Sequence, residues 1–136
     1  MQARVLDTPL QVEAIAASVG DDAAGATVTF LGVVRNHDGG EAVTEIEYVG
    51  HPSADQVIAE VAAEFTEREG VHAIAAVHRV GTLRVGDTAL VVAVAASHRG
   101  QAFSTASDLV DRIKQLLPVW KRQLFTDGRT EWTGCP

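Results

Sequence analysis

The sequence predicts a single α+β domain with mixed or antiparallel sheets and two to three main helices. Apolar, β-branched runs of strand length recur along the chain. Helical periodicity interrupts them without the strict alternation that a parallel α/β protein shows. The chain of 136 residues is long enough to bury one core, and no apolar run reaches the roughly 20 residues of a membrane span. We therefore expect one domain over residues 1–136.

The N-terminal part is expected to form a short strand at 5–6, a helix and a long strand. Thr8 is the expected N-cap of the helix, because Gln11 stands at the capping-box position, and Gly20 ends it. The segment 25–34 is nearly continuous in apolar and β-branched residues, which is typical of a buried strand.

The next part is expected to form a polar loop, a strand and a second helix. Asn, Asp and paired glycines mark 35–40 as a mobile loop, and the alternation at 43–48 indicates a half-buried strand. Ser53 and Gln56 then match a capping box, and apolar residues follow at helical spacing until Gly70.

The C-terminal half is expected to contain two strands at 71–80 and 88–96, joined by a turn-rich connection at 81–87. A last helix should start at Ser97 or His98, because apolar residues then recur on one face until Pro118 stops it. The remainder, 119–136, reads as an extended segment, with a short tail over 123–136.

Composition narrows the class of protein. The formal charge of −7 argues against nonspecific nucleic-acid binding, which needs a basic surface. The N-terminus lacks a signal-peptide core, and the single cysteine, Cys135, cannot form an internal disulfide, so we expect a cytoplasmic protein with no role for this thiol. The spacing of the histidines fits no metal site, and no nucleotide-binding motif is found.

The chain uses lysine only twice, at Lys114 and Lys121, while its nine other basic residues are arginines. Lysine can act as a nucleophile or base when it is desolvated, whereas arginine stays charged. Trp120 beside Lys121 could desolvate the amine and favour its neutral form. Equally, the scarcity of lysine could reflect base composition, with Trp120 in the core and Lys121 on the surface.

Three further basic positions are candidates for ligand contacts. His98 and Arg99 stand where a strand meets the last helix, and a helix N-terminus attracts anions. Arg35 ends a buried strand before the glycine-rich loop. Alternatively, His98 only caps the helix and both arginines are solvated. For His78 and Arg79, which precede a turn, we expect a structural role.

Taken together, the motifs resemble the large, catalytic subunit of molybdopterin synthase, the MoaE family. The pieces that match occur in the family's order over about residues 25–122. They are Gly25–Ala26, Phe30 to His37, Glu45 to Tyr48, His78 to Gly81, Ser97 to Arg99 with Ala102–Phe103, and Lys114 with Pro118 to Arg122.

The resemblance implies an α/β hammerhead-type fold, a homodimer, and a heterotetramer with two small ubiquitin-like subunits. The small subunit carries a thiocarboxylate on its C-terminal Gly-Gly tail. The implied reaction turns cyclic pyranopterin monophosphate (precursor Z) into molybdopterin by transferring two sulfurs, which form the dithiolene. It implies a sulfurtransferase without a cofactor, a resident metal or a nucleic-acid or membrane partner.

Carried over by position, the resemblance assigns Lys114, Lys121 and His98 to catalysis. It assigns substrate binding to these three and to Arg35, Arg99, Arg122 and Gln123. Lys114 would orient the acyl group of the thiocarboxylate, Lys121 would stabilise negative charge or move a proton, and His98 could act as an acid or base.

Gln123 departs from the family, which commonly has glutamate at this position. The change removes a carboxylate beside the expected pocket, and it leaves two alternatives open. The chain could be a non-catalytic paralogue that binds a phosphorylated pterin or the small subunit. It could also be a thioester hydrolase or acyltransferase that uses the same lysines without a ubiquitin-like partner.

Overall fold

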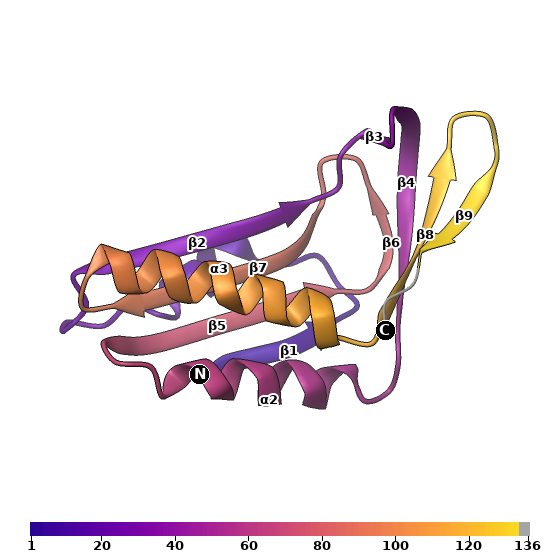
Figure 1. The fold of residues 1–136 in the computed structure, drawn as a ribbon. Helices are drawn as coiled ribbons and strands as arrows, with labels where there is room; N and C mark the ends of the chain where they lie inside the picture. Colours follow the sequence, from indigo (N-terminus) through magenta and orange to yellow (C-terminus); the bar gives the residue numbers. More distant parts are fainter. Residues whose placement is uncertain (134–136) are drawn as a thin grey trace.

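Two sheets divide the chain, and the second stands across one end of the first (Figure 1). The computed structural model describes residues 1–133, so Cys135 and its predicted lack of a role lie outside the described residues. The first sheet has the order β1-β5-β7-β2, in which β1 runs parallel to β5 and the other neighbours are antiparallel. Its strands are β1 (Gln2–Leu6), β5 (Val71–Arg79), β7 (Thr88–Ala96) and β2 (Ala26–Val33).

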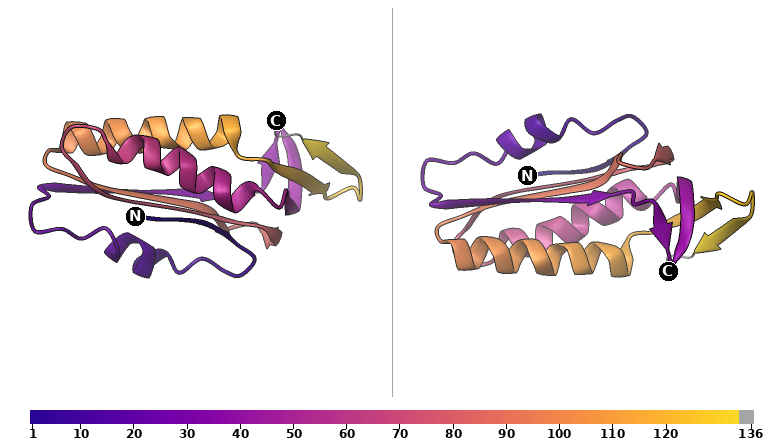
Figure 2. Two further views of the ribbon diagram at one scale, coloured as in Figure 1. Left: turned by 90° about the horizontal axis from the view of Figure 1, so that it is seen from below. Right: turned by 90° about the horizontal axis from the view of Figure 1, so that it is seen from above.

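Helices cover both faces of this first sheet (Figure 2). The long helices α2 (Ala54–Thr66) and α3 (Arg99–Leu116) lie side by side on one face, and α1 (Val12–Ala17) lies on the other. Alternate residues of β5 therefore enter different cores: Ile74 packs under the long helices and Ala75 packs under α1. This double burial explains why β5 and β7 read as continuous apolar runs.

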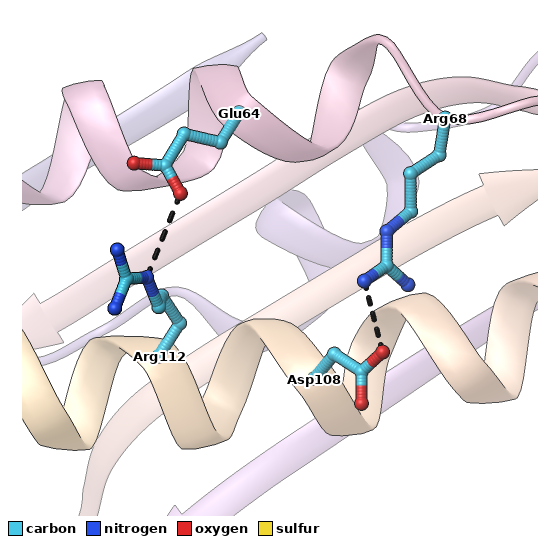
Figure 3. Close-up of polar contacts among 4 residues, drawn as sticks. All are labelled: Glu64, Arg68, Asp108 and Arg112. Atoms are coloured by element: carbon cyan, nitrogen blue, oxygen red, sulfur yellow. Dashed lines mark hydrogen bonds and ion pairs between the residues drawn. The ribbon is translucent and has the colours of Figure 1, made fainter.

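Two ion pairs join the long helices across their exposed sides (Figure 3). Arg68 donates to Asp108 at 2.9 Å, and Nε of Arg112 lies 3.6 Å from the carboxylate of Glu64. These partly exposed pairs contribute at most about 1 kcal/mol each. The packing of α2 and α3 therefore depends mainly on the apolar core beneath them.

The second sheet is built from segments far apart in the sequence. Its main path is β3 (His37–Asp38), β4 (Glu41–Gly50), β8 (Val119–Phe125) and β9 (Thr130–Thr133), and β6 (Gly81–Arg84) also pairs with β4. A third apolar cluster, which includes Leu83 and Phe125, packs under this sheet. The sheet thereby holds β8 at the C-terminal end of α3.

Three segments that were predicted as a loop, a turn-rich connection and an extended tail contain paired strands. The loop at 35–40 includes β3, the turn-rich segment at 81–87 includes β6, and the supposed tail forms the hairpin of β8 and β9. All three pair directly or through a neighbour with β4, which lies up to about 80 residues away from β8 and β9. Partners at such separations leave no local signal, which is why the prediction of a tail was wrong.

Of the two helix caps predicted, the first was wrong in position, and the second was right in position but lacks the predicted side-chain hydrogen bonds. The first helix begins at Val12, after Gln11, instead of after Thr8. The second begins after Ser53, but the Ser53 side chain makes no cap hydrogen bond, and Gln56 donates to Glu60 at 2.9 Å. A side chain one turn away on the helix surface competes for the amide of Gln56. The positions of α2 and α3 agree with the prediction.

Candidate functional site

A pocket of about 540 Å³ opens where the C-terminal end of α3 meets the second sheet. The volume suits a small-molecule ligand. Its lining comes from the ends of β2 and β5, the last turn of α3, and one face of β4 and β8. Both lysines of the chain, Lys114 and Lys121, belong to this lining.

Strand alternation builds the wall that carries Lys121. Tyr48 of β4 pairs with Lys121 of β8, and Ile46 pairs with Gln123. Residues two apart on a strand, and their direct partners, share one face of a sheet. All four side chains accordingly line the pocket.

The same alternation directs Trp120 and Arg122 to the opposite face of the sheet. Nε of Arg122 lies 3.2 Å from Glu47, and its guanidinium lies 5.9 Å from the ring centre of Trp132. Arg122 therefore does not line this pocket in one copy of the chain, and its expected role in substrate binding stays a prediction. Trp120 likewise lies on the opposite face of the strand from Lys121.

Lys114 reaches the pocket from the last turn of α3. Its neighbours Ile113 and Leu117 are buried, and Lys114 itself is exposed, so the lysine stands at the border of the apolar face. The sequence predicted this border position. Helix α3 and strand β8 together bring the two lysines to one pocket, although they lie seven residues apart along the chain.

Arg35 stands at the mouth of the pocket, directly after β2. Its guanidinium lies 3.5 Å from the carboxylate of Asp38, and 68% of its side chain is exposed. Exposed ion pairs of this kind contribute little, so an anionic ligand could replace Asp38 as the partner of Arg35. Arg35, Lys114 and Lys121 together give an acidic protein a local basic pocket.

His98 and Arg99 lie at the opposite end of α3 and do not line this pocket. Lys114 follows His98 by sixteen positions, which corresponds to about 24 Å along the helix axis. The backbone N–H of His98 donates to the Gln101 side chain at 3.1 Å, so His98 occupies the N-cap position, as one of the two sequence readings expected. One copy of the chain does not bring these two residues to the lysines.

Gln123 lies in the pocket wall and is only 2% exposed. Its side-chain oxygen is enclosed and has no hydrogen-bond partner among the described residues. A neutral amide costs less to bury at this position than an unpaired carboxylate would. The structure thus gives a physical reason for glutamine here, where glutamate was expected from the resemblance.

The prediction from the sequence did not include His78 and Tyr48 among the residues that line the pocket. Nδ1 of His78 donates to the carbonyl of Arg79 at 2.7 Å, which confirms the structural role expected for this histidine. The imidazole also lines the pocket and meets the Tyr48 ring edge-on, with ring centres 5.1 Å apart. Only a polar residue at the end of the apolar run 73–77 signalled this position in the sequence.

Burial lowers the pKa of His78 to about 4; the hydrogen bond to Arg79 opposes this shift, and the charge of Lys114 adds to it. Burial also raises the pKa of the Tyr48 phenol. Both side chains are therefore uncharged at neutral pH. These two side chains therefore form an uncharged part of the pocket lining, next to the basic side chains of Lys114, Lys121 and Arg35.

The low pKa of His78 predicts a pH-dependent stability. Between pH 6.5 and about 4 the unfolded chain binds a proton at His78 that the folded chain does not bind. The free energy of unfolding should therefore fall with decreasing pH, by about 3 kcal/mol in all from this residue. Urea unfolding of wild type and His78→Phe at several pH values measures the difference. Equal pH dependence in the two proteins would contradict the prediction.

Residues 1–133 hold no cluster of three or more histidine, cysteine or acidic side chains able to bind a metal ion. None of the helices in this part of the chain is long and apolar enough to cross a membrane.

The family model and the related sequences that match this chain belong to one family. The model of the MoaE protein family matches residues 5–116, which starts nearer the N-terminus than the predicted stretch 25–122. The molybdopterin synthase catalytic subunit of Bacillus subtilis is 38% identical over 96% of this chain and 83% of its own length. Catalytic subunit 1 of Mycobacterium tuberculosis is 35% identical over 96% and 89%.

Solved structures that are similar to this chain belong to the same family. The crystal structure of molybdopterin synthase from Staphylococcus aureus superposes with a TM-score of 0.90 at 31% identity and covers 98% of both chains. The MoaE protein of Burkholderia ambifaria gives a TM-score of 0.81 at 31% identity, over 99% of this chain and 90% of its own. These likenesses confirm the predicted α+β fold.

Proposed function

The chain belongs to the MoaE family, and from this premise we propose that it is the catalytic subunit of a molybdopterin synthase. The proposed reaction converts cyclic pyranopterin monophosphate into molybdopterin with two sulfurs from the thiocarboxylate of a small ubiquitin-like subunit. The observation that carries this proposal is the convergence of Lys114 and Lys121 in one ligand-sized pocket.

The charges of the pocket suit this chemistry. Both the thiocarboxylate and the substrate phosphate are anions, and the protein as a whole carries a charge of −7. Lys114, Lys121 and Arg35 supply local positive charge that attracts and orients them. We assign Lys114 to the incoming acyl group because it is exposed at the helix end, and Lys121 to developing negative charge within the pocket.

A complete site needs a second copy of the chain if His98 and Arg99 take part. These residues lie about 24 Å along α3 from Lys114, beyond the reach of the same pocket. The homodimer expected for this family offers a route, because a second copy can present its own His98 and Arg99 to the pocket of the first. We therefore propose that each site is shared between two copies.

One observation favours a second candidate function. Gln123 replaces the glutamate that is common in the family, and it is buried in the pocket wall. If catalysis required a carboxylate at this position, the chain would bind the pterin or the small subunit without transferring sulfur. The variant Gln123→Glu tests that reading directly, because it restores the acid.

Product formation tests the proposed function. The chain should form molybdopterin when it is mixed with cyclic pyranopterin monophosphate and a thiocarboxylated small subunit. The same small subunit with an ordinary carboxylate is the control and should give no product. A stable complex without product would favour the binding-only reading, especially if Gln123→Glu restored turnover. Cleavage of a simple thioester by the chain alone would favour a hydrolase.

A further inference from the structure

Two uncharged polar groups line the pocket and have no hydrogen-bond partner among residues 1–133. They are Nε2 of His78 and the phenol oxygen of Tyr48, and both residues belong to the lining. The hydrogen bond of His78 described above uses Nδ1, and Tyr48 contacts His78 through its ring. Within residues 1–133, no hydrogen bond reaches either Nε2 or the phenol oxygen.

The protonation state of His78 follows from its surroundings. A backbone carbonyl only accepts hydrogen bonds, so Nδ1 must carry the proton that binds the carbonyl of Arg79. In the neutral ring Nε2 then keeps its lone pair and acts as an acceptor. Nε2 is not among the enclosed unpartnered atoms of the described residues, so a pocket ligand can reach it.

Tyr48 supplies a complementary donor. Its phenol keeps its proton, because burial favours the neutral form. The two rings meet at an interplanar angle of 78°, which is the edge-to-face arrangement that aromatic pairs prefer. This packing fixes the two rings against each other, so an acceptor and a donor belong to one pair of contacting side chains in the pocket lining. Lys121 stands directly across from Tyr48 on β8 and places a positive charge next to the pair.

We propose that His78 and Tyr48 together bind the pyrimidinone edge of a pterin, where an N–H group and a carbonyl stand side by side. Nε2 of His78 accepts the hydrogen bond of the ring N–H, and the Tyr48 phenol donates to the carbonyl. The basic groups Arg35, Lys114 and Lys121 then face the phosphate and the thiocarboxylate. This inference rests on the proposed function and deepens it, since it assigns the heterocycle and the anionic groups to different parts of the pocket.

A base role fits the imidazole less well. A general base is most effective when its pKa is close to the working pH, and burial and Lys114 hold the pKa of His78 near 4. A buried neutral acceptor, by contrast, discriminates strongly for a ligand that supplies the missing donor. The groups around the ring therefore suit recognition of a neutral edge.

The test separates heterocycle binding from phosphate binding. The variants His78→Phe and Tyr48→Phe remove the acceptor and the donor and keep an aromatic ring at each position. Titration calorimetry measures the Kd of cyclic pyranopterin monophosphate and, separately, of inorganic phosphate. We expect His78→Phe to raise the first Kd roughly tenfold and Tyr48→Phe to raise it several-fold, because each loses one buried hydrogen bond. The Kd of phosphate should stay unchanged in both.

A matched control is His51→Phe, which makes the same substitution at an exposed histidine that bonds Ser53 outside the pocket. It should bind both probes like wild type. If Tyr48→Phe and a folded His78→Phe bound the pterin like wild type, or lost phosphate binding equally, the inference would be wrong while product formation by wild type still supported the proposed function. If wild type neither bound nor converted the pterin, the proposed function would fail first. Should His78→Phe not fold, Tyr48→Phe alone decides between these outcomes.

Discussion

Replacing Lys114 or Lys121 by alanine should reduce molybdopterin formation by roughly 10²- to 10⁴-fold, because each change removes a positive charge that faces the reacting groups. Both side chains line the one pocket that also contains Arg35. Lys114 is exposed and Lys121 is half-buried, so neither substitution opens a cavity in the core. The free energy of unfolding should therefore change by less than about 1 kcal/mol.

The measurement is product formation with a thiocarboxylated small subunit, with thermal unfolding recorded for each variant. Arg112→Ala is the matched control, since Arg112 lies on the same helix as Lys114 but contacts Glu64 on α2 (Figure 3) and does not line the pocket. It should retain wild-type turnover. Wild-type turnover in both lysine variants would rule out the assignment of the lysines to catalysis.

Mixing two inactive variants should restore activity if the site is shared between copies. Lys114→Ala inactivates the part of a site that contains the lysines. Arg99→Ala inactivates the part at the start of α3, which lies about 24 Å away on the same chain. In a hybrid dimer, one site receives both defects and the other receives none. Random pairing makes half of the dimers hybrid, so activity should return to about a quarter of the wild-type value.

The control for this experiment is a mixture of Lys114→Ala with Lys121→Ala. Both lysines lie in the pocket of one chain, so every site of a hybrid keeps one defect and no activity should return. Both mixtures are prepared by coexpression, so that the two variants pair at random, and each is assayed without separating the hybrid from the parent dimers. Absence of recovery with Arg99→Ala, or equal recovery in both mixtures, would show that the site is not shared in this way.

Much of the fold could be predicted because its signals are local. The apolar periodicity of α2 and α3 and the continuous apolar runs of β5 and β7 placed these elements correctly. The hairpin of β8 and β9 could not be predicted in the same way. Its place depends on pairing with β4, whose paired residues lie 69 to 82 positions earlier in the sequence than those of β8.

The residues of the candidate site likewise divide into those that a local signal in the sequence indicated and those that it did not. Lysine usage and helical spacing indicated Lys114 and Lys121 without a structure, and Arg35 followed from its place at a strand end. The sequence could not show that Arg122 faces away from this pocket, because the register of β8 decides which of its residues line it. His78 and Tyr48 were missed for the same reason, since they come from strands of different sheets.

The sequence by itself therefore determined the α+β class, the family resemblance and the two lysines, since composition, periodicity and motif order are properties of neighbouring residues. Only the tertiary structure decided the rest. It placed Lys114, Lys121, Gln123, Tyr48 and His78 around one pocket, and it separated His98 and Arg99 from them. The physical reason is that strand register and the crossing of two sheets depend on contacts between distant segments, and these contacts choose which face of each strand meets the ligand.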